Sequence, residues 1–283
     1  MINYYLITKP GIVFGNLVTV MAGFLLASRG NVNFELFFAT LLGLCFIMAS
    51  ACVFNNYIDR QVDERMERTK NRALVKGIIS ARNAIAFGVG LGVIGSFLLL
   101  KFTNTLTFTV AAAGFFVYVL LYSLWKCRTI YGTAIGSIAG AVPPIVGYCA
   151  VRNDFDFGAV ILFLMMVLWQ MPHFFSIAIL HLKDYTAAEV QVLPVKKGMQ
   201  RTKIHMVLYI IAFIIASAML TFSGYTGYTY LIIATSFGLF WLTLSIKGFG
   251  LQQKDDLDWG RRMFRFSLLT IFAICILIPF DFV

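Results

Sequence analysis

Apolar stretches long enough to cross a lipid bilayer recur along the whole sequence. A helix needs about 20 residues to cross the hydrocarbon core. Inside hydrocarbon, helices satisfy all backbone hydrogen bonds within one segment. The sequence therefore predicts an all-α integral membrane protein, a bundle of nine transmembrane helices. The expected spans lie near residues 10–28, 35–57, 84–101, 105–124, 131–150, 157–181, 205–223, 228–247 and 264–281.

Composition and charge agree with this class. The chain is 60% hydrophobic and 13% charged, with a mean hydropathy of +0.83, which is too apolar for a soluble domain of 283 residues. Of the 23 Lys and Arg residues, all but Arg29, Lys101 and Arg152 fall on one side of the predicted spans. Because basic residues collect on the cytoplasmic side, this predicts a cytoplasmic N-terminus and a periplasmic C-terminus. The net charge of +10 then reflects topology, and no nucleic-acid partner is expected.

The stretch NNYIDRQVDERMERTKNR, residues 55–72, follows the second apolar run. If the helix continues, Asn55, Asp59 and Asp63 form one stripe with steps of about 6 Å, and Asn56 lies beside it. One interpretation is a solvated helix end whose acids pair with neighbouring arginines. The other is a cation site, because magnesium favours a few carboxylates together with the oxygens of a substrate phosphate.

Basic residues follow this stripe and suit a polyanion. Arginine binds phosphate in a bidentate manner, whereas lysine supplies a point charge. Arg68 and Arg72 are the favoured phosphate ligands, and part of the remaining charge serves topology alone. Acids for a metal beside bases for phosphate indicate a diphosphate site. The other candidate bases are Lys70, Lys76, Lys126 and Arg128.

A second polar stretch, WQMPHFFSIAILHLKDYTAAEVQVLPVKKG, covers residues 169–198. His173 precedes Asp184 by 11 residues. On one continuous helix, His173 would lie about 20° away from the helix face that carries Asp184 and about 16 Å deeper in the membrane. A bend at Pro172 would change this alignment. His173 is then either a helix-packing residue or a ligand and proton donor. The acids of QQKDDLDWGRR, which include Asp256, are expected to form a solvated turn.

These motifs resemble a known family. NNYIDRQVD is similar to the NDxxDxxxD motif of the UbiA superfamily of intramembrane prenyltransferases, with Asn55, Asn56, Asp59 and Asp63 in its polar places. The resemblance narrows to the heme O synthase, or protoheme IX farnesyltransferase, family. It covers essentially the whole chain. The segments that carry it are ITKPGIVFGNL, NNYIDRQVDERMERTKNR, YGTAIGSIAGAVPPIVGY and WQMPHFFSIAILHLKDYTAAEVQVLPV.

The resemblance implies one domain, residues 1–283, whose nine helices surround a central cavity. It implies transfer of the farnesyl group of farnesyl diphosphate to a vinyl group of heme b, with addition of water, giving heme O. The four residues of the first motif would hold Mg²⁺ and diphosphate. Asp184, with Lys183 and Tyr185, would complete the site from the opposite half. Two departures from the wider superfamily reduce the negative charge: Asn56 replaces a frequent aspartate, and the second motif lacks a DxxxD pair.

Chemistry of this kind assigns further expectations to aromatic and apolar residues. An apolar cavity keeps water from the allylic cation, and the ring faces of Tyr118 and Tyr122 are candidates to stabilise it. His173 is a candidate heme ligand or water-orienting group. Pro143 and Pro144 are expected to break the fifth span and widen the cavity.

Two alternatives stay open from the sequence. A prenyltransferase acting on an aromatic acceptor such as a hydroxybenzoate would share the diphosphate site. An ion-coupled transporter would use intramembrane carboxylates as a cation path, although its acids should then lie at mid-membrane. The expected location is the bacterial inner membrane, as a multi-pass protein in contact with lipid. A terminal oxidase or a heme A synthase is the candidate downstream partner.

Overall fold

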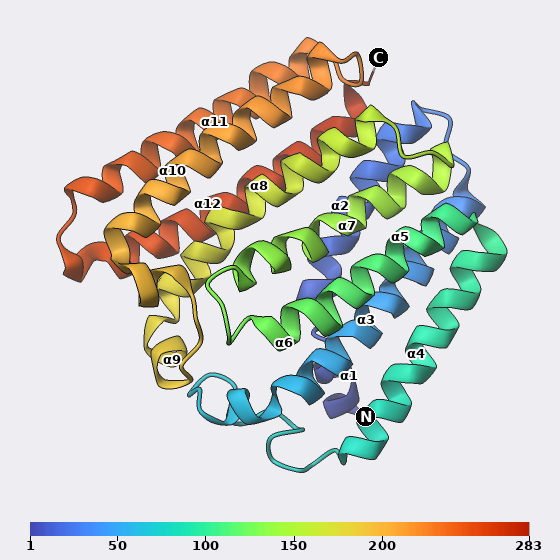
Figure 1. Ribbon diagram of the computed structural model, residues 1–283. Helices are drawn as coiled ribbons and strands as arrows, with labels where there is room; N and C mark the ends of the chain where they lie inside the picture. Colours follow the sequence, from blue (N-terminus) through green and yellow to red (C-terminus); the bar gives the residue numbers. More distant parts are fainter. Residues whose placement is uncertain (283) are drawn as a thin grey trace.

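The computed structural model describes residues 1–282 as a bundle of long helices (Figure 1). Nine helices in this part of the chain are long and apolar enough to cross a membrane. Their cores coincide with the nine predicted spans. The elements are α1 (Ile2–Ile7), α2 (Pro10–Ser28), α3 (Phe34–Glu64), α4 (Ala81–Phe102), α5 (Thr105–Phe116), η1 (Val117–Tyr122), α6 (Ser123–Trp125), α7 (Gly132–Arg152), α8 (Phe157–Leu180), α9 (Leu182–Ala187), α10 (Leu193–Phe222), α11 (Tyr228–Lys247), η2 (Gly248–Gly250), η3 (Gln253–Asp255), α12 (Asp256–Leu277) and η4 (Ile278–Phe280).

Three helices extend well beyond the apolar runs that predicted them. α3 continues to Glu64, so that the whole stripe of Asn55, Asp59 and Asp63 is helical. α10 begins at Leu193 and is kinked at Gly198, whose φ of 81° only glycine adopts without strain. α12 begins at Asp256. Polar ends of helices carry no hydropathy signal, which is why the apolar runs alone do not reveal these extensions.

Side-chain caps define where several helices begin. Asn33 accepts a hydrogen bond from the Leu36 amide, Asn104 from that of Thr107, and Asp156 from those of Gly158 and Ala159. Each satisfies backbone donors that the first turn of a helix leaves without a partner. These caps fix short connections on the side of the bundle opposite residues 65–80 (Figure 1).

Small residues allow the central helices to approach closely. A Cβ atom at Gly23 of α2 would lie 2.0 Å from the carbonyl oxygen of Pro144 in α7, and one at Gly147 would lie 2.2 Å from that of Val20. The helices α3 and α4 meet in the same way at Gly43 and Gly95. In lipid such contacts replace the hydrophobic driving force that packs helices in water.

The fifth span is not broken at its two prolines. Pro143 and Pro144 both lie inside the continuous helix α7 and are buried against its neighbours, so the predicted break is wrong. The irregular helix is the fourth span, where residues Val117–Tyr122 form a π-helix between α5 and α6. Transmembrane helices tolerate proline where the freed backbone groups find other partners. A π-helix widens one turn and frequently accompanies a functional site.

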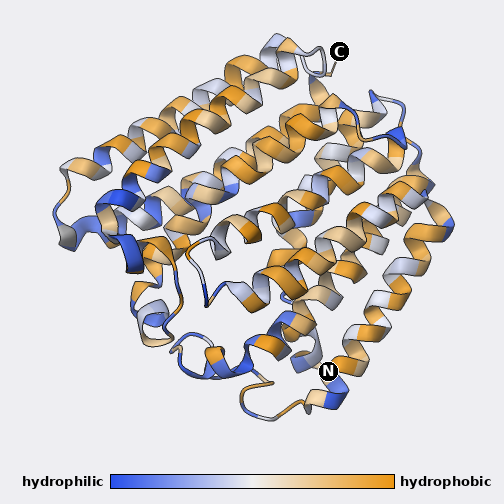
Figure 2. Ribbon diagram, in the orientation of Figure 1, coloured by the Kyte–Doolittle hydropathy of each residue, from blue (hydrophilic) through white to orange (hydrophobic). Residues whose placement is uncertain are grey.

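Polar residues gather at one end of the bundle (Figure 2). That end, called the loop-rich end below, carries residues 65–80, 126–131 and 181–192. The N-terminus lies on the same side of the bundle and the C-terminus on the opposite side (Figure 1). The arrangement agrees with an odd number of spans.

Replacing Gly23 by alanine should destabilise the bundle, because the new methyl group would press on the backbone of Pro144. Overpacking of this kind costs about 1–3 kcal/mol of the free energy of unfolding. Gly15→Ala on the same helix is the matched control, since nothing lies within 4 Å of its Cβ position. Thermal unfolding in detergent measures the difference. An equal loss of Tm in both variants would contradict the packing account.

Candidate functional site

The end of α3 holds a stripe of buried polar side chains. Asn55, Asn56, Asp59 and Asp63 are 1%, 3%, 4% and 5% exposed. The solvated helix end that was the simpler interpretation of this segment is therefore wrong. Buried carboxylates are costly unless cations or hydrogen bonds compensate them. Their surroundings must supply that compensation.

Three members of the stripe, Asn55, Asp59 and Asp63, each meet a basic residue. Lys126 forms an ion pair with Asp59. Arg72 pairs with Asp63 through Nη1 and Oδ2, 2.5 Å apart. Lys9 donates to Oδ1 of Asn55. The structure thus places Asp59 and Asp63 in one cluster with Arg72 and Lys126, two of the predicted phosphate-binding bases.

Lys9 was not expected in this site, because the sequence offered it only as a topology residue. It lies between α1 and α2 with φ 52° and ψ 62°, a left-handed conformation that is rare for lysine and marks local strain. Burial, together with the positive charge of Arg72, lowers the pKa of Lys9 to about 8. The available signal was the position of Lys9 directly before Pro10 in ITKPG.

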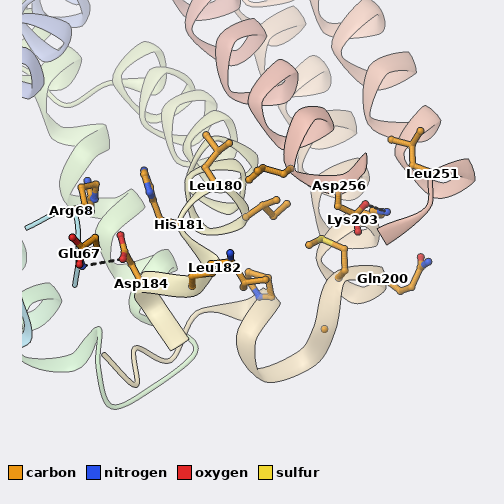
Figure 3. Close-up of a pocket in the computed structure, with 16 residues that line it drawn as sticks. Glu67, Arg68, Leu180, His181, Leu182, Asp184, Gln200, Lys203, Leu251 and Asp256 are labelled. Atoms are coloured by element: carbon orange, nitrogen blue, oxygen red, sulfur yellow. Dashed lines mark hydrogen bonds and ion pairs between the residues drawn. The ribbon is translucent and has the colours of Figure 1, made fainter. Parts of the chain in front are cut away.

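The loop-rich end joins the two halves of the chain. The backbone amide of Glu67 donates to Oδ1 of Asp184, 3.1 Å away, as Figure 3 shows. Met66 packs against Ala188 and Val190 in a small apolar cluster that Tyr185 borders. Asp184 and Tyr185 therefore lie beside the segment that follows α3.

The π-helix positions two tyrosines and a serine beside the stripe. The rings of Tyr118 and Tyr122 are stacked, with centroids 5.4 Å apart and planes at 15°. Ser123 donates to the carbonyl of Tyr118 and accepts from Nδ2 of Asn55 at 2.8 Å. Lys126 lies 5.3 Å from the Tyr122 ring centroid. The sequence did not reveal Ser123, because a π-turn leaves no periodic signal.

His173 and Asp184 do not share one helix. α8 ends at Leu180, His181 follows with φ −113°, and Asp184 lies on the separate helix α9. The predicted alignment on one continuous helix is therefore wrong. Pro172 is not the cause, since it lies inside α8. His173 is buried in α8, away from the loop-rich end.

His181, Arg68 and Lys183 line a groove at the loop-rich end, and Lys76 and Arg128 are two further predicted bases in the loops of that end. Burial and the positive charge of Arg68 lower the pKa of His181. In residues 1–282 none of the four bases forms an ion pair, and each is exposed. Such side chains can reach an incoming anion at little cost. The four bases are Arg68, Lys76, Arg128 and Lys183.

A groove of about 950 Å³ runs from Arg68, His181 and Asp184 to Lys203 and Asp256 (Figure 3). Lys203 is 1% exposed and pairs with Asp256 at 2.5 Å, while its Nζ also donates to the carbonyl of Gly248. The expectation of a solvated turn is therefore wrong for Asp256. Removing one partner of a buried pair is strongly destabilising, which points to a structural role here.

The donor set of the stripe suits a hard cation that brings some of its own ligands. Within residues 1–282, no three His, Cys, Asp or Glu side chains are grouped closely enough to hold a metal ion by themselves. Asp59 and Asp63 supply carboxylates, and Nδ2 of Asn56 donates to the carbonyls of Ile7 and Cys52, which leaves Oδ1 for a metal. Magnesium accepts few protein ligands and keeps water or phosphate oxygens.

The fold and this cluster define a class of membrane enzyme, and comparison with known proteins agrees. Residues 16–269 match the model of the UbiA prenyltransferase family. The chain belongs to this family and is a prenyltransferase.

Two relatives match this chain over its whole length. The chain is 59% identical over 284 residues to "Protoheme IX farnesyltransferase" of Protochlamydia amoebophila, with all of both chains covered. It is 51% identical to the protein of that name from Sodalis glossinidius, covering 100% of this chain and 95% of the relative.

A solved structure supports the fold. The structure described as a UbiA homolog from Archaeoglobus fulgidus bound to DMAPP and Mg²⁺ superposes with a TM-score of 0.77 at 15% identity. It covers 98% of this chain and 99% of that one. At this identity the likeness concerns the fold alone.

Lys9 should make the binding of a prenyl diphosphate sensitive to pH. The protonated amine attracts the anion, and the charged fraction of a group with a pKa of about 8 falls about tenfold between pH 7 and pH 9. Affinity should therefore fall by up to about that factor as pH rises. Binding of farnesyl diphosphate without acceptor, measured by calorimetry, provides the test.

Lys9→Arg is the matched control, because an arginine stays charged over this range. The ratio of the two affinities cancels any titration of the ligand. A constant ratio from pH 7 to pH 9 would refute the role of Lys9.

Proposed function

We propose that this chain transfers the farnesyl group of farnesyl diphosphate to a vinyl group of heme b, with addition of water, giving heme O and diphosphate. The observation that carries this proposal is the full-length 59% identity to a protoheme IX farnesyltransferase. The cluster at the loop-rich end supports it, because acids and bases together match a metal diphosphate. The proposed unit is one domain, residues 1–283.

The basic residues of the cluster bind the diphosphate. Arg72 and Lys126 already lie on the carboxylates of Asp63 and Asp59, within reach of a phosphate that would replace those contacts. Asn55 holds Lys9 toward the same place. Further contacts would come from residues of the loop-rich end, namely Arg68, Lys76, Arg128, Lys183 and Tyr185.

Mg²⁺ would be held through oxygen atoms by Asn56, Asp59 and Asp63 of the stripe and by Asp184 of α9. Phosphate oxygens of the substrate would complete the ligand set, because these side chains do not form a metal site by themselves. When bound, the ion supplies positive charge that stabilises the leaving diphosphate. The cationic side chains act in the same direction, since preorganised charge lowers the barrier without reorganising at the moment of reaction. Asp184 accepts a hydrogen bond from the Glu67 amide, which joins it to the segment that follows the stripe.

The stacked tyrosines are assigned to the allylic cation, because the turn that carries them adjoins the stripe through the bond between Ser123 and Asn55. As the bond between the farnesyl carbon and diphosphate oxygen breaks, the vinyl electrons form the new carbon–carbon bond. The faces of Tyr118 and Tyr122 stabilise the positive charge during this step. The charge then resides beside the porphyrin ring, where the oxygen of water adds and a proton leaves.

His173 contacts the heme from deeper in the bundle. It lies in α8 among aromatic side chains, 9% exposed, which suits a planar apolar acceptor better than a soluble one. Its role is to bind heme or to orient the water that adds. Its place inside α8, before that helix reaches the loop-rich end, is consistent with an acceptor site separate from the diphosphate site.

The topology proposed from the basic residues places the loop-rich end in the cytoplasm and the protein in the bacterial inner membrane. Farnesyl diphosphate would then enter from the cytoplasm, and heme b from the lipid. A terminal oxidase or a heme A synthase would receive the product.

A reconstitution assay tests the proposed reaction directly. The purified protein, incubated with heme b, farnesyl diphosphate and Mg²⁺, should yield a product with the mass of heme O. Omission of Mg²⁺ should abolish the product. Prenylation of 4-hydroxybenzoate without any reaction of heme b would overturn the proposed acceptor.

The carboxylates of the stripe should be required for turnover. Asp59→Asn and Asp63→Asn each remove a charged oxygen ligand, and each should lower kcat by roughly 10²–10³-fold. Asp258→Asn is the control, because this exposed acid pairs only with Arg261 on its own helix. Retention of activity by the Asp59→Asn, Asp63→Asn double variant would refute the metal assignment.

A further inference from the structure

The imidazole of His173 is clamped between two aromatic rings. Its centroid lies 4.8 Å from that of Trp169 on α8, with planes at 20°, and 5.1 Å from that of Phe264 on α12, with planes at 28°. The ring centroid of Phe174 lies 5.8 Å away, with planes at 53°. With aromatic rings packed on the imidazole, the two nitrogen atoms at its edge remain to contact other groups.

One edge is held by Ser267 of α12. Nδ1 of His173 lies 2.7 Å from Oγ of Ser267. That hydroxyl donates its proton to the carbonyl of Phe264, 2.6 Å away. A serine hydroxyl has a single proton, so toward the imidazole it can only accept. The hydrogen of this bond must then reside on Nδ1 of His173.

The backbone of Ser267 is itself fixed in place. Nε1 of Trp169, the residue that stacks on the imidazole, donates to the carbonyl of Ser267 at 2.9 Å. Ser267 is fully buried. The hydroxyl thus cannot turn away to solvent, and the two helices hold the histidine and its partner as one unit.

The other nitrogen is left with a lone pair. A neutral imidazole that carries its proton on Nδ1 is an acceptor at Nε2. No residue within 1–282 forms a hydrogen bond to Nε2. Histidines that ligate metals through one nitrogen almost always donate from the other to a fixed acceptor, which sets the tautomer and the direction of the lone pair.

We propose that Ser267 is a positioning residue that holds His173 in the Nδ1–H tautomer, so that Nε2 is the axial ligand to the iron of the heme acceptor. The inference rests on the proposed function, because it takes heme b as the substrate. Iron binding at this edge would fix the height of the porphyrin along α8 and α12. It would thereby fix which part of its rim faces the prenyl donor.

The first test determines, without heme, which nitrogen of His173 carries the proton. The chain has three histidines, so ¹⁵N NMR of histidine-labelled protein gives few signals, and His173→Ala identifies those of His173. In the unchanged protein Nδ1 should be the protonated nitrogen. Ser267→Ala should shift the population toward the Nε2–H form. Ser267→Thr, which keeps a hydroxyl, should preserve the original tautomer.

Ser176→Ala is the matched control for loss of a buried hydroxyl. Ser176 also lies in the bundle, and its Oγ donates to the carbonyl of Pro172 without touching the imidazole. The tautomer should be unchanged in this variant. A Ser267→Ala protein with the same tautomer as the unchanged protein would overturn the positioning role.

The second test determines whether His173 is a ligand to the heme iron. Absorption and EPR spectra of ferric heme b bound to the purified protein should show a histidine ligand, which His173→Ala removes and added imidazole restores. Ser267→Ala should weaken heme binding about 10-fold or more, in the range found when the partner of a metal-ligating histidine is removed. Ser176→Ala should bind heme as the unchanged protein does.

The outcomes separate this inference from the proposed function. Identical heme spectra in His173→Ala and the unchanged protein, with heme O still formed, would overturn the ligand assignment alone. Failure of the unchanged protein to bind heme b would overturn the proposed acceptor and, with it, the iron ligand. The NMR measurement needs no heme and decides the hydrogen-bond assignment in either case.

Discussion

Buried carboxylates at the end of α3 determine how the loop-rich end is assembled. Asp59 and Asp63 are almost fully removed from solvent, and a buried charge is costly unless a partner of opposite sign meets it. The partners come from separate parts of the chain, Lys126 after the fourth span and Arg72 in the segment after α3. Neutralising two acids therefore draws distant segments together.

The same ion pairs explain how the cluster can serve a ligand. Acids and bases that compensate one another in the free protein can both find new partners in a metal diphosphate, which carries charges of both signs. The pair of Lys203 and Asp256 differs from them. Both of its side chains are buried, and Nζ of Lys203 also donates to the carbonyl of Gly248. The pair therefore joins α10 to α12.

Tight helix contacts and one irregular turn complete the arrangement. Gly23 and Gly147 bring α2 and α7 close enough to bury Pro143 and Pro144 without a break. The π-helix at Val117–Tyr122 turns Tyr118 and Tyr122 into a stacked pair, and Ser123 connects it to Asn55. Local deformation thus occurs beside the polar stripe, where side-chain hydrogen bonds support it.

The sequence alone determined the nine spans, the polar stripe of α3 and its basic neighbours, because hydrocarbon thickness and helical periodicity act on local composition. It misplaced Asp184 relative to His173 and expected a break at Pro143, since neither a helix end nor proline tolerance follows from local sequence. Only the tertiary structure brought Lys9 to Asn55 and Ser267 to His173. Such contacts join residues far apart in the chain, and they depend on which helices pack together and at what depth.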